Sequence, residues 1–275
     1  MSASASASQS SAFAPVRAAF AAFRAHPRAL LPALGAYLLT QAVCLPCGFL
    51  LDRVPESIPL LHLVAEFALR ALIALADTAA ALYVLRVFVR GERPGLSTLA
   101  EPLRWPSAYP KLLLVKFASP LFFFAVTVPI ALFFDVGRSS SFAFLSFLSL
   151  PLFMLYQIWT ESATVLLAVT RGKCRLRDFL VRPARSLGSL FVLAVIFELP
   201  TLLLPLVFAL PPTALFQSYE QIDALLPSIL QAVSASPSRR LALLILGLLP
   251  HLLALPRYAA LGFLYERAVP AAASE

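Results

Sequence analysis

The chain has 275 residues, of which 60% are hydrophobic and only 13% are charged, and its mean hydropathy is +0.85. A soluble domain carries about 25% charged residues, so this composition excludes an ordinary water-soluble fold. The net charge of +8 indicates a polyanionic partner only if the basic residues gather on one surface. The bias towards Ala, Arg, Leu and Pro is typical of a GC-rich bacterial genome.

Residues 1–12 form a low-complexity tail rich in Ser and Ala, which we expect to be disordered. The segment that follows places four apolar side chains on one helical face and three arginines on the adjoining face: Phe13, Val16, Phe20 and Phe23 against Arg17, Arg24 and Arg28. This pattern predicts an N-terminal helix that lies in the membrane interface. The alternative, that the segment simply extends the first membrane span, remains open.

Six apolar runs are long enough to cross the roughly 30 Å hydrocarbon core of a bilayer as helices. They are approximately residues 29–51, 59–89, 112–134, 142–170, 187–210 and 241–265. The sequence therefore predicts an all-α fold, a polytopic membrane helix bundle in which residues 13–268 form one six-helix transmembrane domain. Residues 269–275 are then a short cytoplasmic tail.

The basic residues fix the expected orientation of the six spans. With the N-terminus inside, the inner segments hold sixteen cations: Arg17, Arg24, Arg28, Arg86, Arg90, Arg93, Arg104, Lys111, Lys116, Arg171, Lys173, Arg175, Arg177, Arg182, Arg185 and Arg267. The outer loops hold four: Arg53, Arg138, Arg239 and Arg240. This positive-inside bias predicts a multi-pass protein of the cell inner membrane with both termini in the cytoplasm. The basic loops are expected to meet anionic headgroups, and nucleic-acid binding is not needed to explain them.

The two inner loops resemble each other. When the sequence is shifted by 81 residues, VRGERPGLSTLAEPLR falls on TRGKCRLRDFLVRPAR without a gap, and five of sixteen positions are identical. In each copy an Arg-Gly pair indicates the C-terminal cap of a helix, and Pro-x-Arg precedes the next span. Both copies lie on the same side, so we expect a parallel internal repeat of helix, surface turn and helix over residues 75–117 and 156–198.

This layout resembles the membrane domain fused to some bacterial glycerophosphodiester phosphodiesterases, and related uncharacterised six-span bacterial inner-membrane proteins. The segments that carry the resemblance are HPRALLPALGAYLL, RGERPGLSTL and RGKCRLRDFL, and it extends over roughly residues 12–268. The phosphodiesterase barrel that carries the chemistry of that family is missing here. The resemblance therefore implies a six-span membrane module and no catalytic residue.

Enzymatic motifs are few. Cys44 and Cys47 form a Cys-x-x-Cys pair at the outer end of the first span, which is similar to quinone-coupled membrane thiol oxidases. Such enzymes need a second cysteine pair, whereas Cys174 is the one further cysteine and is expected in the cytoplasm. The sequence has no G-x-S-x-G elbow, no histidine spacing typical of a metal site and no phosphate-binding glycine loop. We expect a protein that is not an enzyme and has no cofactor or metal, with a thiol oxidoreductase as the alternative.

Ionisable residues inside the predicted spans are the candidate functional residues. In the second span, four of them lie within about 80° of one another on a helical wheel: His62, Glu66, Arg70 and Asp77. Others lie in the fourth, fifth and sixth spans: Glu161, Glu198, His251 and Arg257. An unpaired charge at such depth costs at least about 2.5–3.5 kcal/mol, so these side chains are expected to face the bundle interior or a wet cavity.

The depth of these residues predicts which of them meet. Glu161 precedes Arg171 by ten residues and Arg257 precedes Arg267 by ten, so both lie roughly 15 Å from the cytoplasmic edge. We expect an Arg257–Glu161 contact, with Asp77 or Glu198 as the second partner. The cluster is either a polar site for a substrate or proton, or contacts that hold the helices together. We expect the protein to handle a lipid or small molecule, as a transporter, or to organise other membrane proteins as a scaffold.

Overall fold

The structure is a computed structural model that describes residues 12–51, 59–114, 142–201 and 237–266, together with residues 125, 203 and 204. Within these ranges the chain is helical apart from short connections, and no described residue is in a strand. The predicted all-α class is therefore confirmed. The tail of residues 1–11, most of the predicted third span and residues 267–275 lie outside the described part of the chain.

The long helices follow the predicted spans closely. They are α2 (Leu30–Leu51), α3 (Pro59–Val84), α5 (Phe142–Val169) and α10 (Pro237–Glu266). The π-helical turn η2 (Leu85–Val89) continues α3, and η5 (Ala194–Glu198) continues the short α7 (Leu187–Leu193). Among the described residues, one helix, Leu63–Val89, is long and apolar enough to cross a membrane, and its mean hydropathy is 1.9. It lies within the second predicted span.

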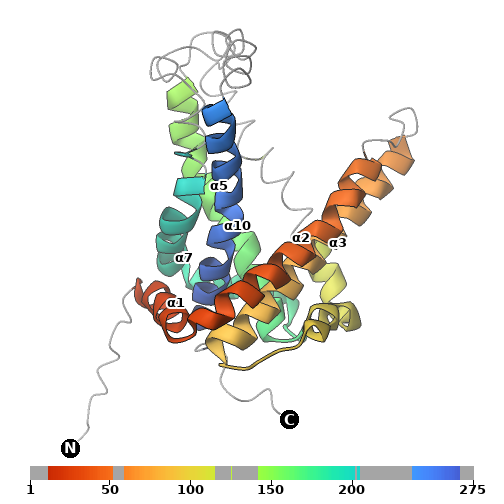
Figure 1. Cartoon of the computed structure of the whole chain (residues 1–275). Coiled ribbons are helices and arrows are strands. Elements are labelled where there is room, and N and C mark those ends of the chain that lie inside the picture. Colours follow the sequence, from red (N-terminus) through yellow and green to blue (C-terminus); the bar gives the residue numbers. More distant parts are fainter. Residues whose placement is uncertain are drawn as a thin grey trace, which may run out of the picture.

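The helices form two groups that meet at one end of the molecule. The antiparallel pair α2 and α3 leans away from the group of α5, α7 and α10, and the two groups converge near α1 (Figure 1). Where they converge, α10 packs closely against η2, because Gly262 has no side chain to hold them apart. A Cβ atom at Gly262 would lie 2.1 Å from Leu85 Cδ2. The core lies at the end where the two groups converge. The half of α3 nearer Pro59 exposes large apolar side chains such as Leu63 and Val64.

The segment before the first span forms a helix of its own, α1 (Ala14–Ala25). The chain bends at His26, with φ −126° and ψ 54°, and then makes the short 3-10 turn η1 (Pro27–Ala29) before α2 begins. Hence α1 does not continue into α2 as one helix. Its inner face packs on η2 and α10, and the Phe23 ring meets the Phe88 ring edge to face at 4.4 Å.

The two loops that resemble each other in sequence share one backbone feature, although Arg171 also has a positive φ of 50° whereas Arg90 has a φ of −99°. Gly91 and Gly172 have φ angles of +67° and +76°, the left-handed region that favours glycine, so the predicted Arg-Gly caps are confirmed. Each cap leads to a short helix, the 3-10 helix η3 (Leu96–Arg104) after the first and α6 (Leu176–Arg185) after the second. Each short helix ends on a bond to a proline carbonyl: Trp105 N–H donates to Pro102 O at 3.1 Å, and Ser186 N–H donates to Pro183 O at 3.0 Å.

Candidate functional site: a buried charge cluster beside a polar cavity

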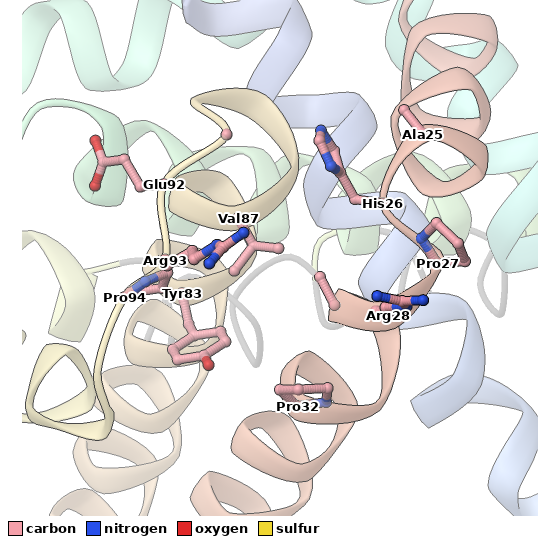
Figure 2. A pocket seen from close by; sticks show the side chains of 12 residues that line it. Ala25, His26, Pro27, Arg28, Pro32, Tyr83, Val87, Glu92, Arg93 and Pro94 are labelled. Atoms are coloured by element: carbon pink, nitrogen blue, oxygen red, sulfur yellow. The ribbon is translucent and has the colours of Figure 1, made fainter.

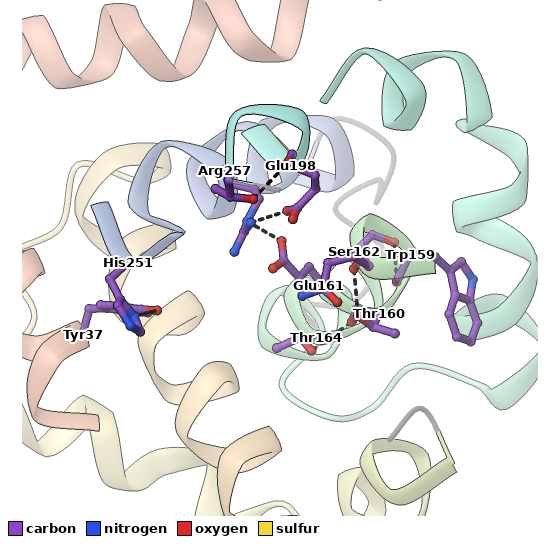
Figure 3. A network of polar contacts seen from close by, with 11 residues as sticks. Tyr37, Trp159, Thr160, Glu161, Ser162, Thr164, Glu198, His251 and Arg257 are labelled. Carbon is purple, nitrogen blue, oxygen red and sulfur yellow. Dashed lines mark hydrogen bonds and ion pairs between the residues drawn. The ribbon is translucent and has the colours of Figure 1, made fainter. Parts of the chain in front are cut away.

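Three charged side chains from three elements meet in the core, and we call them the charge cluster: Glu161, Glu198 and Arg257. Arg257 of α10 lies between Glu161 of α5 and Glu198 of η5, as Figure 3 shows. Its Nη1 donates a hydrogen bond to Glu198 Oε1, and its Nε forms an ion pair with Glu161 Oε2. The predicted Arg257–Glu161 contact is confirmed, and Glu198 is the second partner.

Local backbone features present these side chains to one another. Glu198 closes the π-helical turn η5, whose wider turn rotates the residues after it relative to an uninterrupted α-helix. The hydroxyl of Thr201 donates to the Glu198 carbonyl at 2.7 Å within the same stretch. On α10, Pro256 directly precedes Arg257 and leaves its own backbone position without an N–H donor.

The charge cluster is almost fully sealed from solvent. The exposed fractions are 8% for Glu161, 4% for Glu198 and 6% for Arg257. Burial of ions is costly unless their mutual attraction and hydrogen bonds offset the loss of water, and removal of one partner leaves the others uncompensated. Within these three residues, one guanidinium faces two carboxylates, so the cluster is acidic by one charge when all three are ionised.

A small polar cavity adjoins the Glu161 side of the cluster, and we call it the polar cavity. Its volume is about 90 Å³, room for roughly three water molecules at about 30 Å³ each. It is lined by Asp77 of α3, by Tyr258 of α10 and by one face of α5: Tyr156, Gln157, Thr160, Glu161 and Thr164. The Thr160 and Thr164 hydroxyls donate to the carbonyls of Gln157 and Thr160, at 2.7 and 3.0 Å, so their oxygens remain able to accept.

Two hydrogen bonds tie α2 to this region. Gln41 Nε2 donates to Asp77 Oδ1 at 3.1 Å, and the Tyr37 hydroxyl lies 3.0 Å from His251 Nδ1. The Tyr37 ring also meets the Tyr258 ring edge to face, with centroids 6.4 Å apart. Asp77 and His251 are therefore linked to the same helix, α2, from its two neighbours α3 and α10.

The remaining predicted site residues lie elsewhere. Glu66 and Arg70 form the predicted pair, with Arg70 Nε 2.9 Å from Glu66 Oε1, but each side chain is 36% exposed. Asp77 follows Glu66 by eleven residues, roughly 16 Å along α3, so this pair does not join the cluster. The side chains of His62, Cys44 and Cys47 lie outside the described part of the structure. Among the described residues, no three His, Cys, Asp or Glu side chains gather as metal ligands.

Sequence analysis missed the uncharged members of this site. They are Tyr37, Gln41, Tyr156, Gln157, Thr160, Thr164 and Tyr258. The signal that could have found them is polarity inside an apolar run: Gln41 is the one amide in the first span, and Gln157, Thr160 and Thr164 recur at helical spacing.

No protein-family model, curated protein or solved structure matches this chain. The resemblance of its loops to a phosphodiesterase-associated membrane domain thus remains a prediction. The candidate site is defined by its geometry: a buried acidic cluster, a polar cavity and the hydrogen bonds from α2.

Proposed function

We propose that this chain is a six-span protein of a bacterial inner membrane that conducts protons or a small cation through the polar cavity and is not an enzyme. The basic loops and both termini lie in the cytoplasm in this arrangement. The observation that carries the proposal is that Asp77 and Glu161 line the same polar cavity, next to the buried charge cluster.

Several features support the membrane placement. The helices α2, α5 and α10 contain 22, 28 and 30 residues, which is enough to cross a bilayer core. Large apolar side chains are exposed along the outer parts of the helices, where water would disfavour them. They include Leu38, Leu39, Val43, Leu61, Leu63, Val64, Leu241, Ile245 and Leu252.

A parallel internal repeat is part of the proposal. Its support is the pair of glycine caps, the short helices that occupy matching positions, and the matching carbonyl acceptors Pro102 and Pro183. Two further matched pairs are buried in both copies: Leu85 with Leu166, and Leu112 with Leu193. Two such units, with the first and last spans packed around them, agree with the six-span module that the family resemblance implies.

The chemistry of the polar cavity favours a cation or a proton over an anion. Its described lining has two carboxylates, hydroxyls and an amide, and no basic side chain. Carboxylate and hydroxyl oxygens accept protons and bind hard cations. A cavity of about 90 Å³ has room for water, a proton carrier or a small ion.

Proton flux in proteoliposomes tests this function. The purified protein is placed in vesicles that contain a pH-sensitive dye, and a potassium diffusion potential drives proton entry. We expect flux above that of protein-free vesicles, and we expect Asp77→Asn to abolish it, because an amide cannot carry the proton. Glu66→Gln is the matched control, since Glu66 is an acidic residue on the same helix that lies away from the cavity.

The scaffold alternative makes the opposite prediction. If the buried acids only hold the helices together, the wild-type protein gives no flux with protons, sodium or potassium. Neutralisation of Asp77, Glu161 or Glu198 then changes the unfolding temperature and nothing else. That pattern would overturn the proposed function.

A further inference from the structure

A second and larger cavity lies where α1 turns into α2, beside the end of α3. Its volume is about 760 Å³, within the range of about 300–1,000 Å³ that is usual for small-molecule sites. Figure 2 shows Arg28 and Arg93 on opposite sides of it, with His26 near its upper edge and Tyr83 and Pro32 below. We call it the basic pocket.

The two arginines of the basic pocket differ from their neighbours in having no acidic partner. Arg86 pairs with Glu101 at 2.7 Å, and Arg90 pairs with Glu266 at 2.5 Å. Among the described residues, the side chains of Arg28 and Arg93 form no ion pair and no hydrogen bond.

Glu92 is the one carboxylate among the described residues that line the pocket, and it does not neutralise the two arginines. Glu92 forms an ion pair with Arg86 at 3.7 Å, and in Figure 2 its side chain points away from Arg28 and Arg93. Two guanidinium groups, one from η1 and one from the connection after η2, thus face the same space with uncompensated charge. Such groups bind phosphate through paired N–H donors, so the pocket has the chemistry of a phosphate site.

The walls of the pocket are mostly apolar, and His26 and Tyr83 add polar side chains to them. Val87 is 7% exposed and Tyr83 is 6% exposed, and both line the space with Pro27 and Pro32. The Tyr83 hydroxyl has no hydrogen-bond partner among the described residues. A ligand that fits must therefore combine an anionic head with an apolar portion.

We infer that the basic pocket binds a phosphate-bearing anion, held between Arg28 and Arg93. In the proposed membrane placement, on which this inference rests, both arginines lie at the cytoplasmic edge of the bilayer, next to the ends of the first and second spans. That is the level of phospholipid headgroups. The phosphate can thus belong to an anionic phospholipid or to a soluble phosphate ester, and the experiment separates the two.

Native mass spectrometry of the full-length protein in detergent measures the binding. The probes are phosphatidylglycerol, diacylglycerol, which has the same chains without phosphate, and glycerol 3-phosphate. We expect phosphatidylglycerol to bind and diacylglycerol to bind at least about tenfold more weakly, the effect of losing a charge-assisted hydrogen bond. Displacement of the lipid by glycerol 3-phosphate at similar concentration would assign the site to a soluble ester, and its failure to displace would assign it to lipid.

Paired variants locate the site. We expect Arg28→Gln/Arg93→Gln to weaken phosphate binding by about tenfold per arginine and Arg28→Lys/Arg93→Lys to restore part of it. The control is Arg24→Gln/Arg104→Gln, two exposed arginines outside the pocket, which should leave binding unchanged. Equal binding by the pocket variant and the control, with both eluting as folded monodisperse protein, would overturn the inference.

The result of the lipid-binding experiment does not depend on whether the protein conducts protons. Arg28→Gln/Arg93→Gln should conduct as the wild type does, and Asp77→Asn should bind phosphatidylglycerol as the wild type does. Loss of one property with retention of the other therefore shows which of the two proposals has failed.

Discussion

The charge cluster and the basic pocket hold arginines in opposite ways. Arg257 is sealed in the core between two carboxylates, whereas Arg28 is exposed beside a cavity and has no acidic partner among the described residues. Removal of a buried, paired arginine destabilises the fold, because it leaves the buried carboxylates without a counterion. An exposed, unpaired arginine adds little to stability and remains available to a ligand.

The two loops that contain Gly91 and Gly172 also differ, because one is open to a cavity and the other is covered. Gly91 lines the basic pocket, and a Cβ atom added to it would meet nothing within 4 Å. Gly172 is covered: its carbonyl accepts hydrogen bonds from Ser107 Oγ at 3.1 Å and Lys111 Nζ at 2.8 Å. Similar sequences, each with a left-handed glycine, thus produce one open loop and one sealed loop, because the segment after η3 packs over the second.

The largest expected effect comes from breaking the charge cluster. Arg257→Leu leaves Glu161 and Glu198 buried without their cation, and we expect it to lower the free energy of unfolding by about 3–5 kcal/mol. Arg28→Leu, the matched change in the basic pocket, should alter it by less than about 0.5 kcal/mol. Unfolding of the purified proteins in detergent, followed by circular dichroism, measures both.

The triple variant Arg257→Leu/Glu161→Gln/Glu198→Gln separates charge from packing. Removal of the two acids should recover most of the lost stability, because neutral buried groups need no counterion. Wild-type stability of Arg257→Leu alone would contradict a structural role for the cluster.

A smaller effect is expected from alanine in the two caps. Both Gly91→Ala and Gly172→Ala place a side chain in the left-handed region, at a cost of about 1–2 kcal/mol. At Gly172 the new Cβ would also lie 3.1 Å from Trp105 Cβ and 3.2 Å from Ala108 Cβ, which adds about 1–3 kcal/mol of overpacking. The same unfolding measurement should give Gly172→Ala a lower free energy of unfolding than Gly91→Ala. Equal losses of stability in the two variants would mean that the loop at Gly172 is not sealed.

The smallest expected effect is on the rate at which the Cys174 thiol reacts with maleimide. Position 174 is the repeat counterpart of position 93: Cys174 is 7% exposed, whereas Arg93 is exposed in the basic pocket. Burial raises the pKa of the Cys174 thiol, although the nearby Arg182 charge lowers it in part. Since the thiolate is the reactive form, Cys174 should react slowly with maleimide near neutral pH and faster as the pH rises above the usual range for thiols.

The comparison uses two proteins with one cysteine each. Cys44→Ala/Cys47→Ala retains Cys174, and Cys44→Ala/Cys47→Ala/Cys174→Ala/Arg93→Cys carries the thiol in the open pocket. We expect the second protein to be labelled at least about tenfold faster at pH 7. Equal rates would contradict the difference between the loops.

Sequence patterns predicted the four long helices and the Arg257–Glu161 contact. Hydropathy located α2, α3, α5 and α10, because apolar length is a property of the chain alone. Counting residues from the arginines expected at the cytoplasmic edge predicted that Arg257 meets Glu161, because helical rise converts sequence distance into depth.

The basic pocket could not be predicted in the same way. It depends on the bend at His26, on the path of the loop after η2 and on the acidic partners that Arg86 and Arg90 find elsewhere in the chain. Sequence analysis assigned Arg28 and Arg93 to a basic surface without distinguishing them from the paired arginines. Which cations are neutralised is decided by tertiary contacts.

Both proposals require six membrane crossings with the basic loops in the cytoplasm. Reporter fusions at Gly95, Gly137, Asp178 and Leu225 test this most directly, the second and fourth positions being outside the described residues. We expect the four signals to alternate between cytoplasm and periplasm, with Gly95 and Asp178 in the cytoplasm. A periplasmic signal at Asp178 would contradict the arrangement, and with it the placement of both the polar cavity and the basic pocket.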